Sequence, residues 1–322
     1  MNIFQSHNRM EFNELALQRF NEQYNHVEVY RKFTDYLGVN PDEVSDCNNI
    51  PFLPVELFKS HKISDARTNP ELIFTSSGTT GMEVSQHYVS DPELYKKSFT
   101  QGFQKFYGNP SEYCILALLP SYLQRDGSSL IFMVKELIRI SVHKDSGFYL
   151  NNYEELSEKL MSLKKKNTKV LLLGVSFALL DLAEKFPQDL SGITIMETGG
   201  MKGRKTEITR EELHQKLTSA FKVNTIHSEY GMTELLSQAY SKGKGIYFPP
   251  PWMKIIIKDP HDPFESLTTG KSGRINIIDL ANRDSCCFIA TSDLGKVYEN
   301  GSFEVLGRMD NSDLRGCNLM LG

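Results

Sequence analysis

The N-terminal part of the chain alternates apolar and polar residues with a helical period. Between residues 11 and 37 the apolar side chains recur at mixed spacings of three and four, which is typical of amphipathic helices with one buried face. Proline residues at 51, 54 and 70 then punctuate an irregular stretch. We therefore predict that residues 1–70 form a helical segment packed on a larger core.

Four short apolar runs further along the chain predict buried strands, at residues 72–74, 114–119, 170–173 and 193–196. The last three are each followed by glycine or proline and then by residues with helical spacing. Strands that alternate with helices in this way are typical of a largely parallel sheet with helices on both faces. We therefore predict an α/β core over residues 71–245.

Beyond Pro249 the pattern changes to short β-rich runs separated by turns. These runs lie at residues 254–257, 274–278, 287–290 and 302–305. They predict a smaller β subdomain over residues 246–306. Residues 307–322 form a hinge-like tail in this prediction.

Length and composition agree with one large α/β domain or two unequal lobes. The chain has 322 residues, of which 40% are hydrophobic and 24% charged, an ordinary globular composition. Its formal net charge of -4 and pI of about 6.1 give no general attraction to nucleic acid or to an anionic membrane. We therefore expect no nucleic-acid partner, and any anionic ligand must be held locally.

The N-terminus and the cysteines indicate the compartment. The chain does not open with a basic start followed by an apolar run, and no stretch approaches the roughly 20 apolar residues of a membrane span. We therefore expect a cytoplasmic protein with no membrane span. The five cysteines form neither a CxxC pair nor a Cys/His metal spacing, so we expect free thiols and no disulfide scaffold or zinc site.

A cluster of small hydroxyl residues follows the first predicted strand. It consists of Thr75, Ser76, Ser77, Gly78, Thr79, Thr80 and Gly81. Hydroxyl groups, together with backbone N–H groups that glycine leaves free to turn, suit the oxygens of a triphosphate. The cluster lacks the Gly-Lys-Ser/Thr ending of a Walker loop, which argues against a kinase or a GTPase. Taken alone, the cluster also fits a surface turn without a ligand.

Five short motifs follow one another along the chain. They are the hydroxyl cluster at 75–81, Glu197-Thr198-Gly199-Gly200, Tyr230-Gly231-Met232-Thr233-Glu234, Thr291-Ser292-Asp293-Leu294-Gly295 and Gly307-Arg308-Met309-Asp310. In this order they resemble the adenylate-forming superfamily, which includes acyl-CoA ligases and nonribosomal-peptide adenylation domains. The resemblance implies the N-terminal domain of such an enzyme, with largely parallel sheets, flanking helices and a small β subdomain.

A closer resemblance covers nearly the whole chain beyond the N-terminal helices. It rests on LLPSYL at 118–123, GFYL at 147–150, GVSFALLD at 174–181, IHSEYGMTE at 226–234 and DLRGCNLM at 313–320. These segments are similar to the LuxE family, the acyl-protein synthetases of bacterial luminescence. The family implies ATP-dependent activation of a fatty acid or another carboxylic acid, with a reductase protein as the next acyl acceptor.

The resemblance assigns nucleotide contacts to particular residues. The hydroxyl cluster would hold the β and γ phosphates of ATP, and Glu234 would bind the Mg²⁺ that bridges them, since a carboxylate is a hard ligand. Tyr230 would stack near the adenine. The predicted contacts also include Gly199, Gly200, Gly231, Met232 and Thr233. On its own, Tyr230 also fits a core aromatic residue.

Two further residues are assigned to the ribose side of the nucleotide. Asp293 would accept hydrogen bonds from the ribose hydroxyls, and Arg308 would lie near the ribose or a phosphate. Taken singly, they also fit an aspartate turn and a surface ion pair. Asp310 resembles the hinge residue of the superfamily.

The resemblance leaves the catalytic cation open. Adenylation puts charge on the pyrophosphate leaving group, so the site needs a cation near the transferring phosphorus. Many members of the superfamily supply a lysine from a large C-terminal domain, and we expect that domain to be absent because the chain ends shortly after Asp310. The candidates within the chain are His87, Lys202, Arg204, Lys205 and Arg210. Each of them also fits a solvated charge on a loop.

Cys317 is the candidate acyl carrier. Its position matches the C-terminal cysteine that the LuxE family is understood to acylate, and a thiolate beside Arg315 suits thioester formation. The acyl pocket should be apolar. Its candidate wall residues, which equally fit an ordinary core, are Tyr122, Leu123, Phe148, Tyr149, Phe177, Leu179 and Leu180.

Three functions remain open at this point. The first is an acid–protein ligase that forms an acyl-adenylate and transfers the acyl group to Cys317. The second is a CoA ligase resembling phenylacetate-CoA ligase, which the segment Arg315-Gly316-Cys317-Asn318 also resembles. The third is a non-catalytic nucleotide-binding subunit, which would bind ATP without releasing pyrophosphate.

Overall fold

The computed structural model describes residues 2–5, 8–76, 83–120, 127–199 and 208–309. Contacts divide the chain into two compact units. The central unit is Asn69–Pro250, and the split unit combines Met1–Thr68 with the segment that begins at Pro251.

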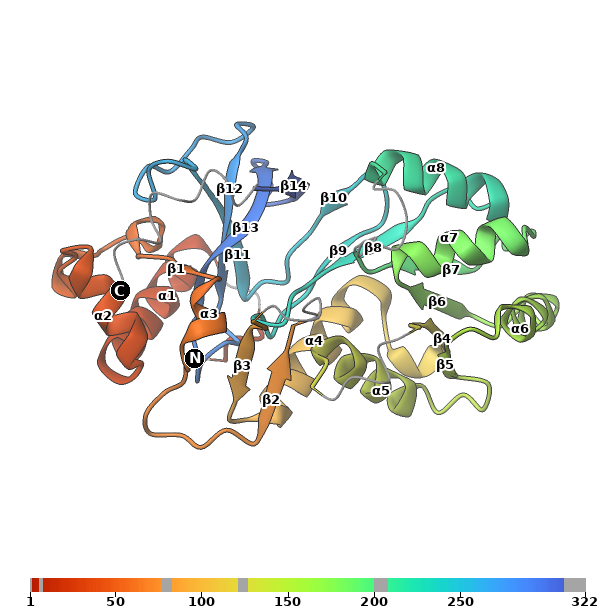
Figure 1. Cartoon of the computed structure of the whole chain (residues 1–322), viewed down its shortest axis with the longest axis horizontal. Helices are drawn as coiled ribbons and strands as arrows, with labels where there is room; N and C mark the ends of the chain where they lie inside the picture. The colour runs from red at the N-terminus through yellow and green to blue at the C-terminus, as the bar shows by residue number, and fades with distance from the viewer. Residues whose placement is uncertain (1, 6–7, 77–82, 121–126, 200–207, 310–322) are drawn as a thin grey trace. The chain divides into compact units, whose positions relative to one another are not determined.

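The central unit is built on a mainly parallel sheet with strand order β5-β4-β6-β7-β8-β9 (Figure 1). The first five strands in this order run parallel, and β9 pairs antiparallel with β8. The strands are β4 (Cys114–Leu118), β5 (Gly147–Tyr149), β6 (Val170–Gly174), β7 (Thr194–Glu197), β8 (His227–Tyr230) and β9 (Ala239–Ser241). Strands β4 and β6 are buried along their whole length, as expected for a sheet covered on both faces.

Helices cover both faces of this sheet. Figure 1 shows α7 and α8 over one face and α4 and α5 against the other. The strand order reverses direction after β5, so right-handed crossovers place α5 opposite the helices that follow it. The helices are α4 (Pro92–Tyr107), α5 (Ser129–Ser141), α6 (Tyr153–Lys165), α7 (Ser176–Lys185), α8 (Arg210–Phe221) and the 3₁₀ turn η3 (Pro110–Glu112). This arrangement confirms the predicted α/β core.

A separate hairpin completes the central unit. Strands β2 (Leu72–Thr75) and β3 (Gln86–Val89) pair antiparallel, and the short strand β10 (Ile246–Tyr247) ends the unit. Helix α4 follows the hairpin. Asp91 caps its N-terminus, Pro92 occupies the first turn, and Gly108 with a φ of 85° ends it, as the sequence rules for helix ends predict.

The split unit contains an antiparallel sheet with strand order β14-β13-β12-β11. The strands are β11 (Met253–Lys258), β12 (Gly273–Asp279), β13 (Phe288–Val297) and β14 (Phe303–Arg308). The short strand β1 (Leu53–Pro54) adds to β13 in parallel register. All four predicted β runs are therefore strands, and β13 extends well beyond the predicted end at residue 290.

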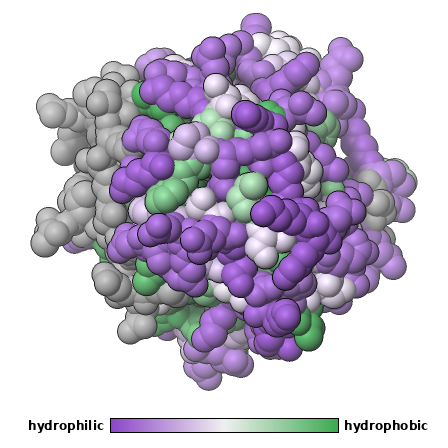
Figure 2. Space-filling model, turned by 90° about the vertical axis from the view of Figure 1, so that its right-hand side faces the viewer, coloured by the Kyte–Doolittle hydropathy of each residue, from purple (hydrophilic) through white to green (hydrophobic). Residues whose placement is uncertain are grey.

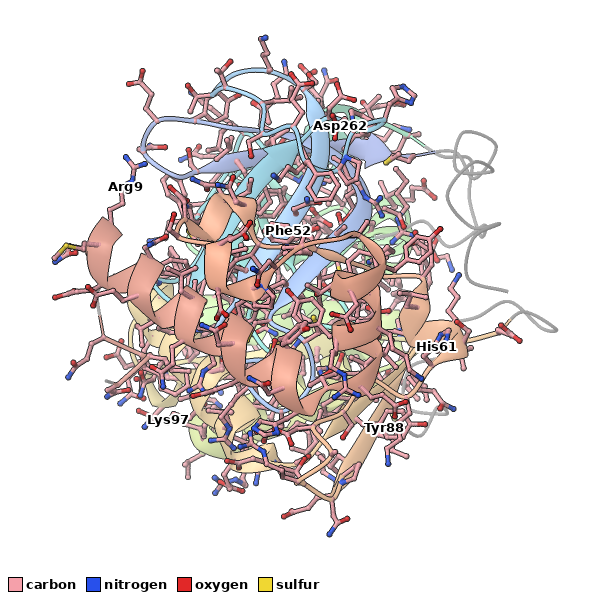
Figure 3. The ribbon with its side chains drawn as sticks, turned by 90° about the vertical axis from the view of Figure 1, so that its left-hand side faces the viewer. Arg9, Phe52, His61, Tyr88, Lys97 and Asp262 are labelled. Atoms are coloured by element: carbon pink, nitrogen blue, oxygen red, sulfur yellow. The ribbon has the colours of Figure 1, made fainter. Side chains whose placement is uncertain are left out.

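The N-terminal helices pack against this antiparallel sheet. Figure 3 shows α1 (Arg9–His26) and α2 (Glu28–Tyr36) lying over the strands of the split unit. Asn8 and Glu11 form a capping box that fixes the start of α1. The remaining helical turns of this segment are η1 (Pro41–Glu43), η2 (Cys47–Asn49) and α3 (Leu57–Ser60).

A buried amide locks α1 to the strand connection between β12 and β13. Gln23 Nε2 donates to the carbonyl oxygens of Asn282 and Arg283 at 3.0 and 2.9 Å, and Cys287 N donates to Gln23 Oε1 at 2.9 Å. We predicted residues 1–70 as a segment packed on the α/β core and residues 246–306 as a separate β subdomain. In the structure these two segments form one unit, because the buried faces of the helices are matched by this sheet.

Figure 2 views the central unit from the side of α6 and shows a mostly hydrophilic surface with hydrophobic residues scattered among polar ones. Within the described ranges, every helix is too short or too polar to cross a bilayer.

Candidate functional site

The motif residues of the central unit lie where parallel strands end. In the sheet register, Gly174 of β6 is level with Glu197 of β7, which is level with Ser228 of β8. The segments that follow β7 and β8 therefore leave the same edge of the sheet. The carboxyl edge of a parallel sheet is where ligands bind in open α/β folds.

Glu197 anchors the turn that follows β7. Its Oε2 accepts hydrogen bonds from Gly199 N at 2.9 Å and from Ser176 Oγ at 3.2 Å. Its Oε1 lies 3.8 Å from Arg210 Nε and 3.7 Å from His214 Nε2, both on α8. Burial alone would raise the pKa of Glu197, but its hydrogen bonds and the charge of Arg210 hold that pKa below its usual range. The carboxylate is therefore ionised and fixes Gly199, whose φ is 39°.

Glu229 lies beside Glu197 and contacts both motif loops. Thr198 Oγ1 donates to Glu229 Oε2 at 2.6 Å. A Cβ added to Gly231 would lie 2.5 Å from Glu229 Oε1, so a larger residue there would force this carboxyl group to move. Burial raises the pKa of Glu229 to about 7; the Thr198 hydrogen bond opposes this shift, and the charge of Glu197 adds to it.

Tyr230 is part of a small aromatic group at the same edge. Its side chain is 9% exposed, and its ring lies edge-on to that of Tyr247 with centroids 5.8 Å apart. The guanidinium of Arg210 lies 5.2 Å from the ring centroid of Tyr247. Arg210, one of the candidate cations, thus contacts Glu197 and Tyr247 in this structure.

The segment after β8 is held to the β2–β3 hairpin. His87 of β3 is fully buried, and its Nδ1 donates to the carbonyl oxygen of Thr233 at 2.8 Å. Glu234, the next residue, is 6% exposed. His87 therefore supports the segment that carries the predicted metal ligand, and it does not present a cation to solvent.

The base of the hydroxyl cluster is also held by the backbone. Thr75 N donates to the carbonyl oxygen of Gly127 at 2.8 Å. Ser76 N donates to Ser85 O at 3.1 Å, and Ser85 N donates to Ser76 Oγ at 2.9 Å. These contacts close the two ends of the loop across the hairpin.

Asp293 and Arg308 pair with each other in the split unit. They are opposite one another in the register of β13 and β14, and Arg308 Nε lies 3.4 Å from Asp293 Oδ1. The Asp293 side chain is 10% exposed, whereas that of Arg308 is 86% exposed. Asp293 lies within strand β13 and not in a turn, so the alternative of an aspartate turn is wrong.

Several candidate residues lie outside the described residues. They are Ser77, Gly78, Thr79, Thr80, Gly81, Tyr122, Leu123, Gly200, Lys202, Arg204, Lys205 and Cys317. The other four cysteines are buried, and desolvation is the leading cause that raises the pKa of each thiol. Of the candidate pocket residues, Tyr149, Phe177, Leu179 and Leu180 are buried, which fits both a core and a pocket wall.

Sequence reasoning missed the two buried carboxyl groups. Glu197 and Glu229 were quoted inside motifs but given no role. A signal was present for Glu197, which stands at the end of an apolar run where a parallel strand would deliver it to the ligand-binding edge. Glu229 lies in the polar strand His227–Tyr230, and its contact with Thr198 depends on β7 and β8 being neighbours.

Solved structures of ligases share this fold. An open conformation of 2-hydroxyisobutyryl-CoA ligase, in complex with 2-HIB-AMP and CoA, matches with a TM-score of 0.67 and 10% identity, covering 95% of this chain and 72% of that chain. ATP-bound MatB from Rhodopseudomonas palustris matches with a TM-score of 0.56 and 16% identity, covering 77% of this chain and 49% of that chain. A long-chain-fatty-acid-CoA ligase from Archaeoglobus fulgidus matches with a TM-score of 0.54 and 16% identity, covering 78% of this chain and 54% of that chain. The predicted fold of an adenylate-forming enzyme is thereby confirmed, although this chain spans only about half the length of the latter two chains.

A curated relative and a family model agree with the sequence motifs. The relative is the long-chain-fatty-acid–luciferin-component ligase of Vibrio harveyi, 23% identical over 323 residues that cover 92% of this chain and 84% of the relative. The model of the family described as acyl-protein synthetase, LuxE, matches residues 3–322. The chain therefore belongs to the LuxE family of acyl-protein synthetases, as its motifs predicted.

Proposed function

We propose that the protein uses ATP to activate a fatty acid, or another carboxylic acid, as an acyl-adenylate and then transfers the acyl group to Cys317. The observation that carries the proposal is the edge of β7 and β8, where Glu197 and Glu229 hold two motif loops in place. Membership of the LuxE family supports the choice of reaction.

The first step joins the acid to the nucleotide. A carboxylate oxygen attacks the α-phosphorus of ATP, the bond from that phosphorus to the oxygen bridging to the β-phosphorus breaks, and pyrophosphate leaves with the electron pair. Negative charge grows on the leaving group, so donors and cations must be placed around it in advance. The hydroxyl cluster that begins at Thr75 and Ser76 would supply donors to the β and γ phosphates.

Glu234 suits the Mg²⁺ that such a reaction needs. Mg²⁺ is usually bound through one or two carboxylates together with substrate phosphates, and Glu234 provides a carboxylate in the segment that follows β8. Bound there, the ion would neutralise charge on the leaving pyrophosphate. His87 would hold the Glu234 segment in register through its bond to Thr233.

The remaining nucleotide contacts follow the family assignment. Tyr230 would lie near the adenine, with Gly199, Gly231 and Met232 close by. Asp293 would accept hydrogen bonds from the ribose, and the exposed guanidinium of Arg308 would be available to a phosphate or the ribose. The catalytic cation would come from Lys202, Arg204 or Lys205.

The second step moves the acyl group to sulfur. The thiolate of Cys317 attacks the acyl carbon, the bond from that carbon to the AMP oxygen breaks, and the thiol proton passes to solvent. The other four cysteines are buried, and their raised pKa values keep them as thiols at neutral pH. A reductase protein would be the next acceptor of the thioester.

A labelling experiment separates the two steps. Purified protein is incubated with ATP, Mg²⁺ and radiolabelled carboxylic acids, and both pyrophosphate release and hydroxylamine-labile label on the protein are measured. We expect Cys317→Ser to abolish the label, because the serine hydroxyl is not ionised near neutral pH, while acid-dependent pyrophosphate formation in the first turnover remains. Cys47→Ser is the matched control, since serine preserves an acceptor for Lys254 Nζ, which lies 3.3 Å from the sulfur.

Two other results would overturn parts of the proposal. Pyrophosphate release with no label on the wild-type protein would place the acceptor elsewhere, and acyl-CoA formation on addition of CoA would identify a CoA ligase. ATP binding without pyrophosphate release for any acid would identify a nucleotide-binding subunit.

A further inference from the structure

Glu229 is a buried carboxyl group that takes no part in either chemical step of the proposed reaction. We propose that it is a positioning residue for ATP: by holding Thr198 on one side and passing Gly231 closely on the other, it fixes the two motif loops at the separation that the nucleotide needs. This inference rests on the proposed function and assigns a role within the same site.

The contacts of Glu229 join segments that are 31 residues apart in sequence. Thr198 Oγ1 donates to Oε2 at 2.6 Å, which is the short distance expected for a hydrogen bond to a carboxylate. On the other side, the space that a Cβ on Gly231 would need is taken by Oε1 at 2.5 Å and by Gln238 Cγ at 3.3 Å. The carboxyl group thus sets the path of both loops.

The Thr198–Gly199 turn is held from two directions. Glu229 binds the threonine side chain, while Glu197 binds the backbone N–H of Gly199 at 2.9 Å. Glu197 has its own cation in Arg210, whose Nε lies 3.8 Å from Glu197 Oε1, so its charge is balanced within the unit. Each of the two carboxyl groups therefore holds one side of the turn through a hydrogen bond.

The surroundings of Glu229 make its hydrogen bond with Thr198 sensitive to pH. The groups that interact with its charge are Glu197 on β7, Tyr240 on β9, Tyr107 on α4 and Tyr247 on β10. None of these supplies a positive charge. Since the pKa of Glu229 is raised to about 7, the carboxylate that binds Thr198 most strongly gives way to the neutral acid as pH falls through neutrality.

The test compares ATP recognition by four variants with that of the wild type. Glu229→Gln keeps the shape and removes the charge, Thr198→Val removes the donor, and Thr198→Ser restores a hydroxyl. Glu212→Gln is the matched control, because Glu212 is an exposed glutamate on α8 whose Oε1 lies 3.3 Å from Lys216 Nζ. The measurements are KM for ATP and kcat in acid-dependent ATP–pyrophosphate exchange, the calorimetric Kd for ATP, and Tm. Each is made at about pH 6 and about pH 8, a range in which phosphate groups also titrate.

We expect Glu229→Gln and Thr198→Val each to raise KM and Kd for ATP about tenfold at the higher pH, with kcat within about twofold of the wild type. Thr198→Ser and Glu212→Gln should match the wild type. When the pH is lowered, KM for ATP should rise more in the wild type than in Glu229→Gln, because only the wild type has the Glu229 carboxylate to lose. Titration of ATP itself affects all variants alike. The double variant Thr198→Val/Glu229→Gln should be no worse than either single variant.

The inference is overturned if Glu229→Gln leaves KM, Kd and their pH dependence unchanged, or if it only lowers Tm and the amount of active protein. Absence of exchange activity in the wild type is a different failure, because it would reject the proposed function; the calorimetric Kd would then still report on the loops.

Discussion

His227 is a half-buried histidine whose neutral form the fold favours. It begins β8, and its Nδ1 shares a hydrogen bond with the hydroxyl group of Tyr107 at 3.1 Å. Burial lowers the pKa of His227 from 6.5 to about 4, and the charges of Lys242 and His214 act in the same direction. The unfolded chain therefore takes up a proton at a higher pH than the folded protein does.

The sign of the effect on stability follows from this difference. Between pH 6.5 and about pH 4 the unfolded state binds more protons at His227, so the free energy of unfolding falls as the pH is lowered through this window. We expect His227→Gln to lose this dependence, amounting to on the order of 1–2 kcal/mol after allowance for solvent screening. Urea unfolding followed by circular dichroism at both ends of the window measures it, with the exposed His261→Gln as the control. An unchanged pH dependence in His227→Gln would contradict this assignment.

At the residue scale, chemistry was easier to predict than contacts. The sequence motif from Tyr230 to Glu234 indicates a nucleotide site. It does not indicate which residues form hydrogen bonds with Glu229 or with Thr233. Glu229 meets Thr198 only because β7 and β8 are adjacent, and His87 meets Thr233 across 146 positions of sequence. The residue types indicate which chemical groups are available, whereas the tertiary fold decides which of these groups come into contact.

At the element scale, Gln23 is the most specific link between α1 and the antiparallel sheet. The amide is 1% exposed and satisfies two carbonyl oxygens and one N–H of the segment between β12 and β13. A helix that docks through a buried polar group is held in one register, because any shift leaves these backbone groups without partners.

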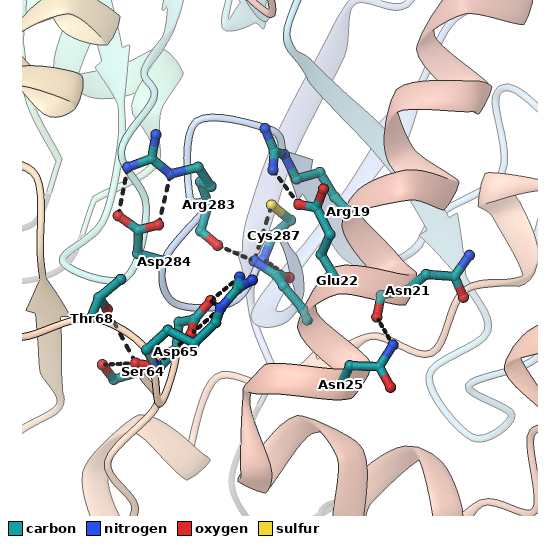
Figure 4. Close-up of polar contacts among 12 residues, drawn as sticks. Arg19, Asn21, Glu22, Asn25, Ser64, Asp65, Thr68, Arg283, Asp284 and Cys287 are labelled. Atoms are coloured by element: carbon teal, nitrogen blue, oxygen red, sulfur yellow. Dashed lines mark hydrogen bonds and ion pairs between the residues drawn. The ribbon is translucent and has the colours of Figure 1, made fainter.

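We expect Gln23→Ala to lower the free energy of unfolding by about 2–4 kcal/mol, since it leaves buried backbone groups unsatisfied and removes packing. Asn25→Ala on the same helix is the matched control, because Asn25 is exposed and its side chain bonds only to the helix backbone in Figure 4. Denaturant titration of the two variants provides the comparison. Equal losses in both would show that the buried amide has no special part in docking α1.

Most elements were predictable from local pattern, and their partners were not. Strands β4, β6 and β7 of the central sheet and β11 to β14 of the antiparallel sheet match predicted apolar runs, whereas β5, β8 and β9 were not predicted. The amphipathic face of α1 is visible at residues 11–37. That this face would bury itself against β12 and β13 depends on contacts about 260 residues away, as with Gln23 and Arg283. Strand β13 continued beyond the apolar run because pairing with β12 and β14 holds its polar residues, among them Asp293.

At the scale of the whole molecule, family membership and fold agree. The LuxE model spans residues 3–322, and ligases of the adenylate-forming kind share the fold at identities of 10% to 16%. At such identities, structural similarity establishes only the fold. The proposed reaction rests on the motif residues that this fold brings to the edge of the central sheet.

Acid-dependent exchange of radiolabelled pyrophosphate into ATP tests the central claim most directly, because it requires reversible formation of an acyl-adenylate and needs no acyl acceptor. The account predicts exchange with Mg²⁺, ATP and a long-chain fatty acid, in the wild type and in Cys317→Ser alike, and its loss when the acid is omitted. ATP binding without exchange for any carboxylic acid, in protein that is folded by circular dichroism, would contradict it.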